Sequence, residues 1–145
     1  MRCSSRIKIN QRKIDQLSRA AVIALEETAE ALHTEEVQAG VVPRDTGTLE
    51  GEAFFVDKSE SSGGKVSLVN STPYARRLYF HPEYNFHQEP WEETIHKRDG
   101  TEKTLKHDGN PNAKGKWHDD WLPGGSKGDF ASKTFKELYR RNAGL

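Results

Sequence analysis

The chain has 145 residues, of which 33 % are hydrophobic and 30 % charged, whereas an average globular protein has about 45–50 % apolar residues. A mean hydropathy of −0.89 and the lack of a run of about 18 apolar residues argue against a membrane protein and a large-cored enzyme. The composition predicts one domain with a thin core, whose burial a partner surface would complete.

The cysteine content and the N-terminal residues restrict the kinds of site and the cellular compartment that we expect. Cys3 is the only cysteine, which excludes an internal disulfide and a cysteine-based zinc site and favours a reduced, intracellular compartment. The basic start is not followed by an apolar segment, so we expect no secretory signal.

The formal net charge of zero hides an uneven distribution. Residues 1–20 carry six bases and one acid, residues 21–62 two bases and ten acids, residues 63–125 nine of each, and residues 126–145 five bases and two acids. Basic ends and an acidic shoulder would let subunits associate head to tail. The alternative is that the termini fold back onto the acidic segment within one subunit.

The first predicted element is a helix over residues 10–38, which Gly40 ends. Its apolar face repeats at the 3–4 spacing of a helix and comprises Ile14, Leu17, Ala21, Ala24, Leu25, Thr28 and Leu32. Bases in its first turns and glutamates in its later turns oppose the helix dipole. These charges either interact with the surface of another molecule or form a solvated face.

Residues 41–49 contain Pro43 and Gly47, which argue against a regular element, and Asp45 or Thr46 could cap a short turn there. Residues 52–58 and 65–70 alternate as two strands of a β-hairpin, joined by a flexible turn.

A single turn of helix is predicted to follow, with Thr72 as its N-cap and Pro73 at its first position. It would dock Tyr74 against the sheet. The aromatic-rich residues 79–88 predict another strand, broken by Pro82.

Residues 93–106 resemble a tight hairpin around Asp99-Gly100, a strong signal for a two-residue type I′ turn. That turn would pair Lys97 with Glu102, Ile95 with Thr104 and Glu93 with Lys106. The hairpin has only two aliphatic residues to bury, so we expect a projecting arm that packs on a partner or a neighbouring copy. The alternative is a mobile surface excursion.

Trp117 and Trp121 lie four residues apart. They could stack on bases or fill a protein pocket, or they could close the thin core. A final helix is predicted over residues 130–142, with Asp129 as its cap and Gly144 after its end. Its apolar stripe comprises Phe130, Phe135, Leu138 and Tyr139.

No motif in the chain points to catalysis. The six histidines lack a known metal-ligand spacing, no serine sits in a nucleophile elbow, and phosphate-loop and dinucleotide motifs are missing. We therefore expect no catalytic residue, metal or cofactor. Two alternatives stay open: a nucleic-acid-binding module that uses the basic N-terminus and the two tryptophans, and a small metal-dependent hydrolase or nuclease built on His118, Asp119 and Asp120.

The order of features resembles a known family. The segment Val42-Pro43-Arg44-Asp45-Thr46-Gly47-Thr48-Leu49 lies between a long helix and a strand pair, and Pro73-Tyr74-Ala75 follows about 30 residues later, before a final amphipathic helix. This arrangement, over residues 10–88 and 126–143, is similar to the minor capsid and tail-completion proteins of tailed bacteriophages. Leu78-Tyr79-Phe80-His81 departs from the acid, aromatic and glycine that the family shows there, and residues 89–122 form a long excursion.

The resemblance implies a non-enzymatic structural subunit of the virion, at the neck, which joins the head connector to the tail as part of a ring oligomer. It would assemble in the cytoplasm of the bacterial host. Its partners would be copies of itself, other head–tail connector and tail proteins, and DNA passing in the lumen, with no membrane.

We therefore expect a single α+β domain over residues 1–145. A small, mostly antiparallel sheet would be flanked by a long N-terminal helix and a C-terminal helix, with a projecting β-hairpin arm. Residues 1–9 would form a basic arm, residues 10–88 and 126–143 the core, and residues 89–125 an inserted excursion. The candidate interface residues are Arg2, Arg6, Arg12, Lys13, Glu26, Glu30, Lys97, Glu102, Trp117 and Trp121.

Overall fold

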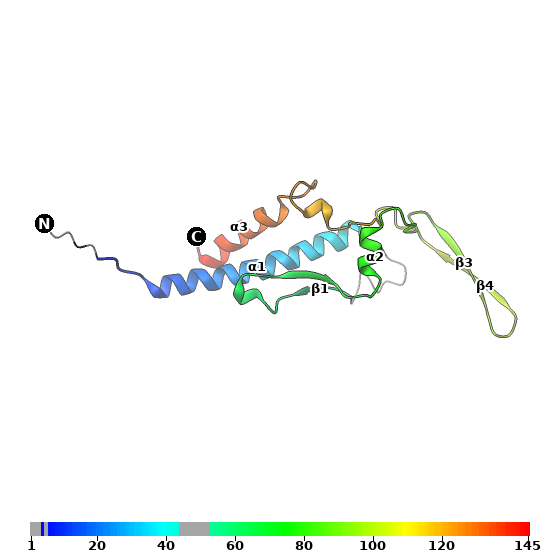
Figure 1. Ribbon diagram of the computed structural model, residues 1–145, viewed down its shortest axis with the longest axis horizontal. Coiled ribbons are helices and arrows are strands. Elements are labelled where there is room, and N and C mark those ends of the chain that lie inside the picture. The colour runs from blue at the N-terminus through cyan, green and yellow to red at the C-terminus, as the bar shows by residue number, and fades with distance from the viewer. Residues whose placement is uncertain (1–3, 5, 44–52) are drawn as a thin grey trace.

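The computed structural model describes residues 4, 6–43 and 53–145, and it has the predicted α+β class. The elements in chain order are α1 (Gln11–Ala39), β1 (Phe54–Asp57), β2 (Ser67–Asn70), α2 (Ala75–Phe80), β3 (Trp91–His96), β4 (Glu102–His107) and α3 (Phe130–Ala143). In Figure 1, α3 lies along α1, the β1–β2 hairpin lies along another side of α1, and β3–β4 projects at one end. No helix in the described ranges is long and apolar enough to cross a bilayer.

The long helix α1 has the predicted ends. The Asn10 side chain accepts a hydrogen bond from the backbone N–H of Lys13 at 3.1 Å, and Gly40 ends the helix with φ of 65°, a conformation that costs glycine little. The buried face holds Ala20, Ala24, Thr28, Ala29 and Glu36. Ile14, predicted on this face, is 46 % exposed, because α1 extends past the segments that cover it.

The first hairpin pairs β1 with β2 in antiparallel register, with Phe54 opposite Asn70 and Val56 opposite Leu68. Each strand has four residues and is shorter than predicted. The intervening turn contains a 3₁₀ turn at Ser61–Gly63, and Ser61 is buried. The predicted pairing is confirmed, and Phe54 faces the core.

The prediction of a strand over residues 79–88 is wrong. Tyr79 and Phe80 form the last turn of α2, and the described backbone from 81 to 90 contains no strand. The helix begins at Ala75, two residues later than predicted, and Ala75 is the buried residue, while Tyr74 is 44 % exposed. The aromatic content reflects side-chain packing around a helix end, because Tyr79 packs edge-on against Trp117 at 4.9 Å between ring centroids.

The second hairpin is present, but its predicted register is wrong by one residue. Gly100 has φ of 82°, and its N–H donates to the carbonyl oxygen of Lys97 at 3.0 Å, which makes a three-residue loop that ends in a left-handed residue. Asp99 Oδ1 accepts from the backbone N–H of Thr101 at 2.9 Å and holds this loop. The facing pairs are therefore Glu92 with Lys106, Glu93 with Leu105, Thr94 with Thr104, Ile95 with Lys103, and His96 with Glu102.

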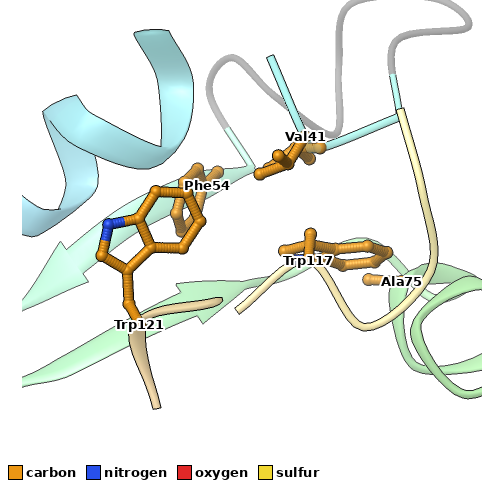
Figure 2. Close-up of a cluster of buried hydrophobic side chains, with 6 residues drawn as sticks. Val41, Phe54, Ala75, Trp117 and Trp121 are labelled. Atoms are coloured by element: carbon orange, nitrogen blue, oxygen red, sulfur yellow. The ribbon is translucent and has the colours of Figure 1, made fainter. Parts of the chain in front are cut away.

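The chain after β4 returns to the body. Asn110 Nδ2 donates to the carbonyl oxygen of Gly40 at 2.8 Å, and Ala113, Trp117 and Trp121 are buried. The core cluster comprises Val41, Val42, Phe54, Ala75, Trp117 and Trp121, and Figure 2 shows the two indoles on the same cluster as Phe54 and Val41. Residues 89–125 are thus not one excursion: only the β3–β4 hairpin projects, and the following segment completes the core.

The C-terminal helix α3 is confirmed over one residue more than predicted. Asp129 makes no side-chain cap; its carboxylate pairs with Lys133 instead. Gly144 ends the helix with φ of 70°. Lys127, three residues before α3, pairs with Glu35 of α1, and Arg141 in the last turn of α3 pairs with Glu27, so α3 runs antiparallel to α1.

Candidate interaction surfaces

The two tryptophans belong to the core. Trp117 is 1 % exposed and Trp121 is 5 % exposed, and Trp117 Nε1 donates to Asn70 Oδ1 at 3.2 Å. The indole N–H of Trp121 has no acceptor within the described part of the chain. The structure places neither residue on the surface, so their assignment as interface or base-stacking residues is corrected in favour of the core interpretation.

A polar junction lies beside the tryptophans, where the last turns of α1 meet α2 and residues 116–122. Glu36 is 1 % exposed, and its Oε2 lies 2.7 Å from His118 Nδ1. The Tyr79 hydroxyl donates to Asp119 Oδ1 at 2.7 Å. Burial is the main cause that raises the pKa of Tyr79, and this hydrogen bond is the second. Both pairs join segments that are far apart in sequence, so the junction holds the thin core together.

The residues of the hydrolase alternative do not converge on one point. His118 contacts Glu36, Asp119 accepts from Tyr79, and Asp120 Oδ2 pairs with Lys114 Nζ at 2.6 Å. Within the described ranges, no three His, Cys, Asp or Glu side chains are arranged to hold a metal ion. Each of the three side chains has a structural partner of its own.

The acidic side of α1 is neutralised in part within the subunit. Glu27 pairs with Arg141 at 3.0 Å, and Glu35 with Lys127 at 3.6 Å. The C-terminal bases therefore fold back onto the acidic segment, as the second interpretation of the charge pattern predicted.

Two predicted interface residues of α1 lie near Lys58 of the first hairpin. Glu30 pairs with its ammonium group at 2.7 Å. This hydrogen bond raises the pKa of Lys58, and the charge of Glu26 adds to the effect. Because Glu30 is half exposed, this pair contributes little stability.

The N-terminal bases, unlike the C-terminal ones, do not pair with acidic residues of the described chain. Arg6, Arg12 and Lys13 are exposed, and none forms an ion pair with another described residue. The N-terminal segment leads away from α3 and from both hairpins (Figure 1). Arg2, a predicted interface residue, lies outside the described residues, as does the predicted turn at Asp45–Thr46.

The β3–β4 arm is exposed along most of its length. Glu102 pairs with His96 at 3.0 Å and not with Lys97, which corrects the predicted pair. At the base of the arm, the Trp91 ring is stacked between His87 and His107, with centroids 4.1 and 4.2 Å apart.

Three hollows open on the surface near α2. The first, about 390 Å³, is lined by Pro43, Tyr74, Arg77, Tyr84 and Phe86, among others. The other two, about 250 and 240 Å³, lie beside β2 and share Leu68, Tyr79 and His118.

Sequence reasoning missed Glu36 as a structural residue. A signal was present, because Glu36 lies four residues after Leu32 and eight after Thr28, on the apolar face of the helix. An acid at such a position predicts a buried partner. The identity of that partner, His118, depends on contacts across 82 residues.

We compared the chain with family models, curated proteins and solved structures, and none of them matches it.

Proposed function

We propose that this chain is a structural virion protein of a tailed bacteriophage, a minor capsid or tail-completion subunit of the neck that joins the head connector to the tail in a ring oligomer. The proposal draws on the order of motifs in the sequence and on the shape of the subunit. Its mechanism is surface complementarity between neighbouring subunits.

The observation that carries the proposal is the β3–β4 arm. Its strands pair with each other and make no extensive contact with a helix or with the first hairpin. Ile95, 39 % exposed, lies on the same face as Leu105, and an isolated two-stranded hairpin is only marginally stable in water. A neighbouring ring or protein that covers this face would supply the missing burial.

The nucleic-acid alternative keeps only the exposed N-terminal bases, because both tryptophans are buried. Phosphate contacts without stacking partners would give sequence-independent, salt-sensitive binding. Such contacts also suit a ring through which DNA passes, so they fit inside the proposed function.

A shortened arm tests the proposal. Replacing residues 92–106 with Asn-Gly keeps Trp91 opposite His107 and gives a two-residue hairpin turn. We expect this variant to fold, because the arm adds nothing to the core cluster, and to fail to join heads to tails in an in vitro assembly assay.

Thr94→Ser with Thr104→Ser, on the opposite face of the arm, is the matched control and is expected to assemble normally. A shortened variant that unfolds would show that the arm belongs to the core. A folded variant that still joins heads to tails would contradict the role of the arm.

A further inference from the structure

The N-terminal segment before α1 has the pattern of an unpaired strand. Ile7 and Ile9 alternate with Arg6, Lys8 and Asn10, the period-2 pattern of an amphipathic strand. The two isoleucines are 84 % and 69 % exposed. A tail that stays in solvent does not need two large aliphatic residues on one side. We therefore expect another protein surface to cover this face.

An open strand edge lies elsewhere on the molecule, along β2. The Ser71 N–H donates to the Ala53 carbonyl oxygen at the end of the β1–β2 ladder, at 2.8 Å. Bonded and non-bonded pairs alternate in an antiparallel ladder, so Leu68 and Asn70 direct their backbone N–H and C=O groups away from β1. Within the described chain, no backbone group pairs with them.

The β2 edge at Leu68 and Asn70, together with the two hollows beside it, forms a groove. The two hollows that share Leu68, Tyr79 and His118 lie directly beside it, and their volumes of about 250 and 240 Å³ each accommodate a branched aliphatic side chain. The matching edge of β1 is partly closed by α1, because His33 Nε2 lies 2.9 Å from the carbonyl oxygen of Phe54.

Two buried donors at the hollows lack partners. Asn70, which lines one hollow, has no acceptor for Nδ2, and Trp121, which lines the other, has none for Nε1 within the described residues. A buried unpaired donor is costly. An incoming backbone, with one carbonyl at each residue, carries the acceptors that such donors need.

The segment cannot reach the groove of its own subunit. The groove lies beside Leu32 and Glu36, and a helix rises 1.5 Å per residue, so Leu32 is about 32 Å from Gln11. Ile7 is four residues from Gln11 and can lie at most about 14 Å away. The N-terminal segment and the groove lie at opposite ends of α1 (Figure 1), so only a second copy of the chain can bring them together.

We propose that residues 6–10 of one subunit add as a strand to the β2 edge of the next, with Ile7 and Ile9 in the two hollows and Arg6 and Lys8 facing outward. Strand addition of this kind combines main-chain hydrogen bonds with pockets for alternate side chains. A heterologous contact between opposite ends generates a ring where the rotation closes. The inference rests on the proposed function for this ring, and it names the contact that builds it.

A peptide of residues 1–10 provides the direct test, with a subunit that lacks residues 1–9 as its receptor. We expect amide shifts in a ¹⁵N-labelled receptor at Leu68, Asn70 and Tyr79, and a shift of the Trp121 indole N–H. Ile7→Ser with Ile9→Ser in the peptide should weaken binding more than tenfold. Arg6→Gln with Lys8→Gln is the matched control, expected to stay within about fivefold.

The groove is tested in the full chain by Leu68→Asp, which should abolish self-association measured by light scattering. Val69→Asp, on the outer face of β2, should leave it unchanged. If Leu68→Asp fails to fold, the peptide titration still decides.

No shifts at 1 mM peptide, or shifts confined to another surface, would overturn the strand contact. If the peptide binds as described but the subunit plays no part in joining heads to tails, the proposed function fails and the strand contact stands. If the subunit joins heads to tails but the peptide does not bind, the reverse holds.

Discussion

His118 Nδ1 lies 2.7 Å from Glu36 Oε2, and this contact joins the last turns of α1 to the segment that carries both core tryptophans. One proton lies between Nδ1 and Oε2, because a hydrogen bond at this distance needs a donor on one side and an acceptor on the other. The pair is unequal, since the side chain of Glu36 is 2 % exposed and that of His118 is 24 % exposed. Among the described residues, His118 is the only side chain that makes a hydrogen bond to the Glu36 carboxyl group.

We predict that His118→Ala destabilises the subunit by about 3 kcal/mol, because it leaves a buried acid without its partner. Urea denaturation measures the loss. Glu36→Gln with His118 retained is the matched comparison and should cost less, since an amide oxygen can still accept from Nδ1. A His118→Ala loss below about 0.5 kcal/mol would mean that the pair contributes nothing to stability.

The two tryptophans should respond differently to replacement by phenylalanine. Trp117→Phe loses a hydrogen bond to Asn70, so we expect it to cost about 1 kcal/mol more than Trp121→Phe, which removes a donor that has no partner. Both variants lose a similar ring volume. Thermal unfolding of the two variants side by side checks the order, and a larger loss for Trp121→Phe would contradict it.

Tyr79 should make the fold sensitive to alkali. Its pKa is raised by burial and by the Asp119 carboxylate, so the folded state favours the neutral phenol more strongly than the unfolded chain does. This contribution is fully present below about pH 10, the ordinary pKa of tyrosine, and is lost as the pH rises through the folded value. We expect stability to fall above about pH 10, and Tyr79→Phe to reduce that fall. Equal pH profiles for the two proteins would contradict this prediction.

We expect self-association to weaken with salt, because exposed N-terminal bases contribute to it. Arg12 and Lys13, which follow the proposed strand, have no ion-pair partner among the described residues, while the segment from 21 to 62 is acidic. Screening shortens the range of such attraction from about 10 Å at 0.1 M to about 3 Å at 1 M. Light scattering across a tenfold salt range measures the effect. An oligomer of constant mass would show that charge does not hold it together.

Local signals predicted the helices well. The ends of α1 follow from Asn10 and Gly40, and the end of α3 follows from Gly144, because capping groups act within one turn of the chain. The pattern also predicted the first hairpin, since Phe54 and Val56 lie on one face of the strand and the exposed Phe55 lies on the other.

Local signals were insufficient for the arm and for the junction. Asp99-Gly100 suits a two-residue turn, but the bond from Thr101 N–H to the Asp99 side chain favours the longer loop, and one residue of difference changes every facing pair. The aromatic content around Tyr79 suits a strand, yet Tyr79 lies at a helix end and packs against Trp117.

The amino-acid sequence by itself determined the α+β class, the two flanking helices and the two hairpins, because these depend on caps, turns and periodicities within a few residues. Only the tertiary structure decided that Trp117 and Trp121 complete the core, that Glu36 is buried against His118, and that the C-terminal bases neutralise part of α1. The basic and acidic segments of a chain with zero net charge do not reveal which of them meet. Those pairings depend on how the chain returns after the arm, and on burial that many distant residues create together.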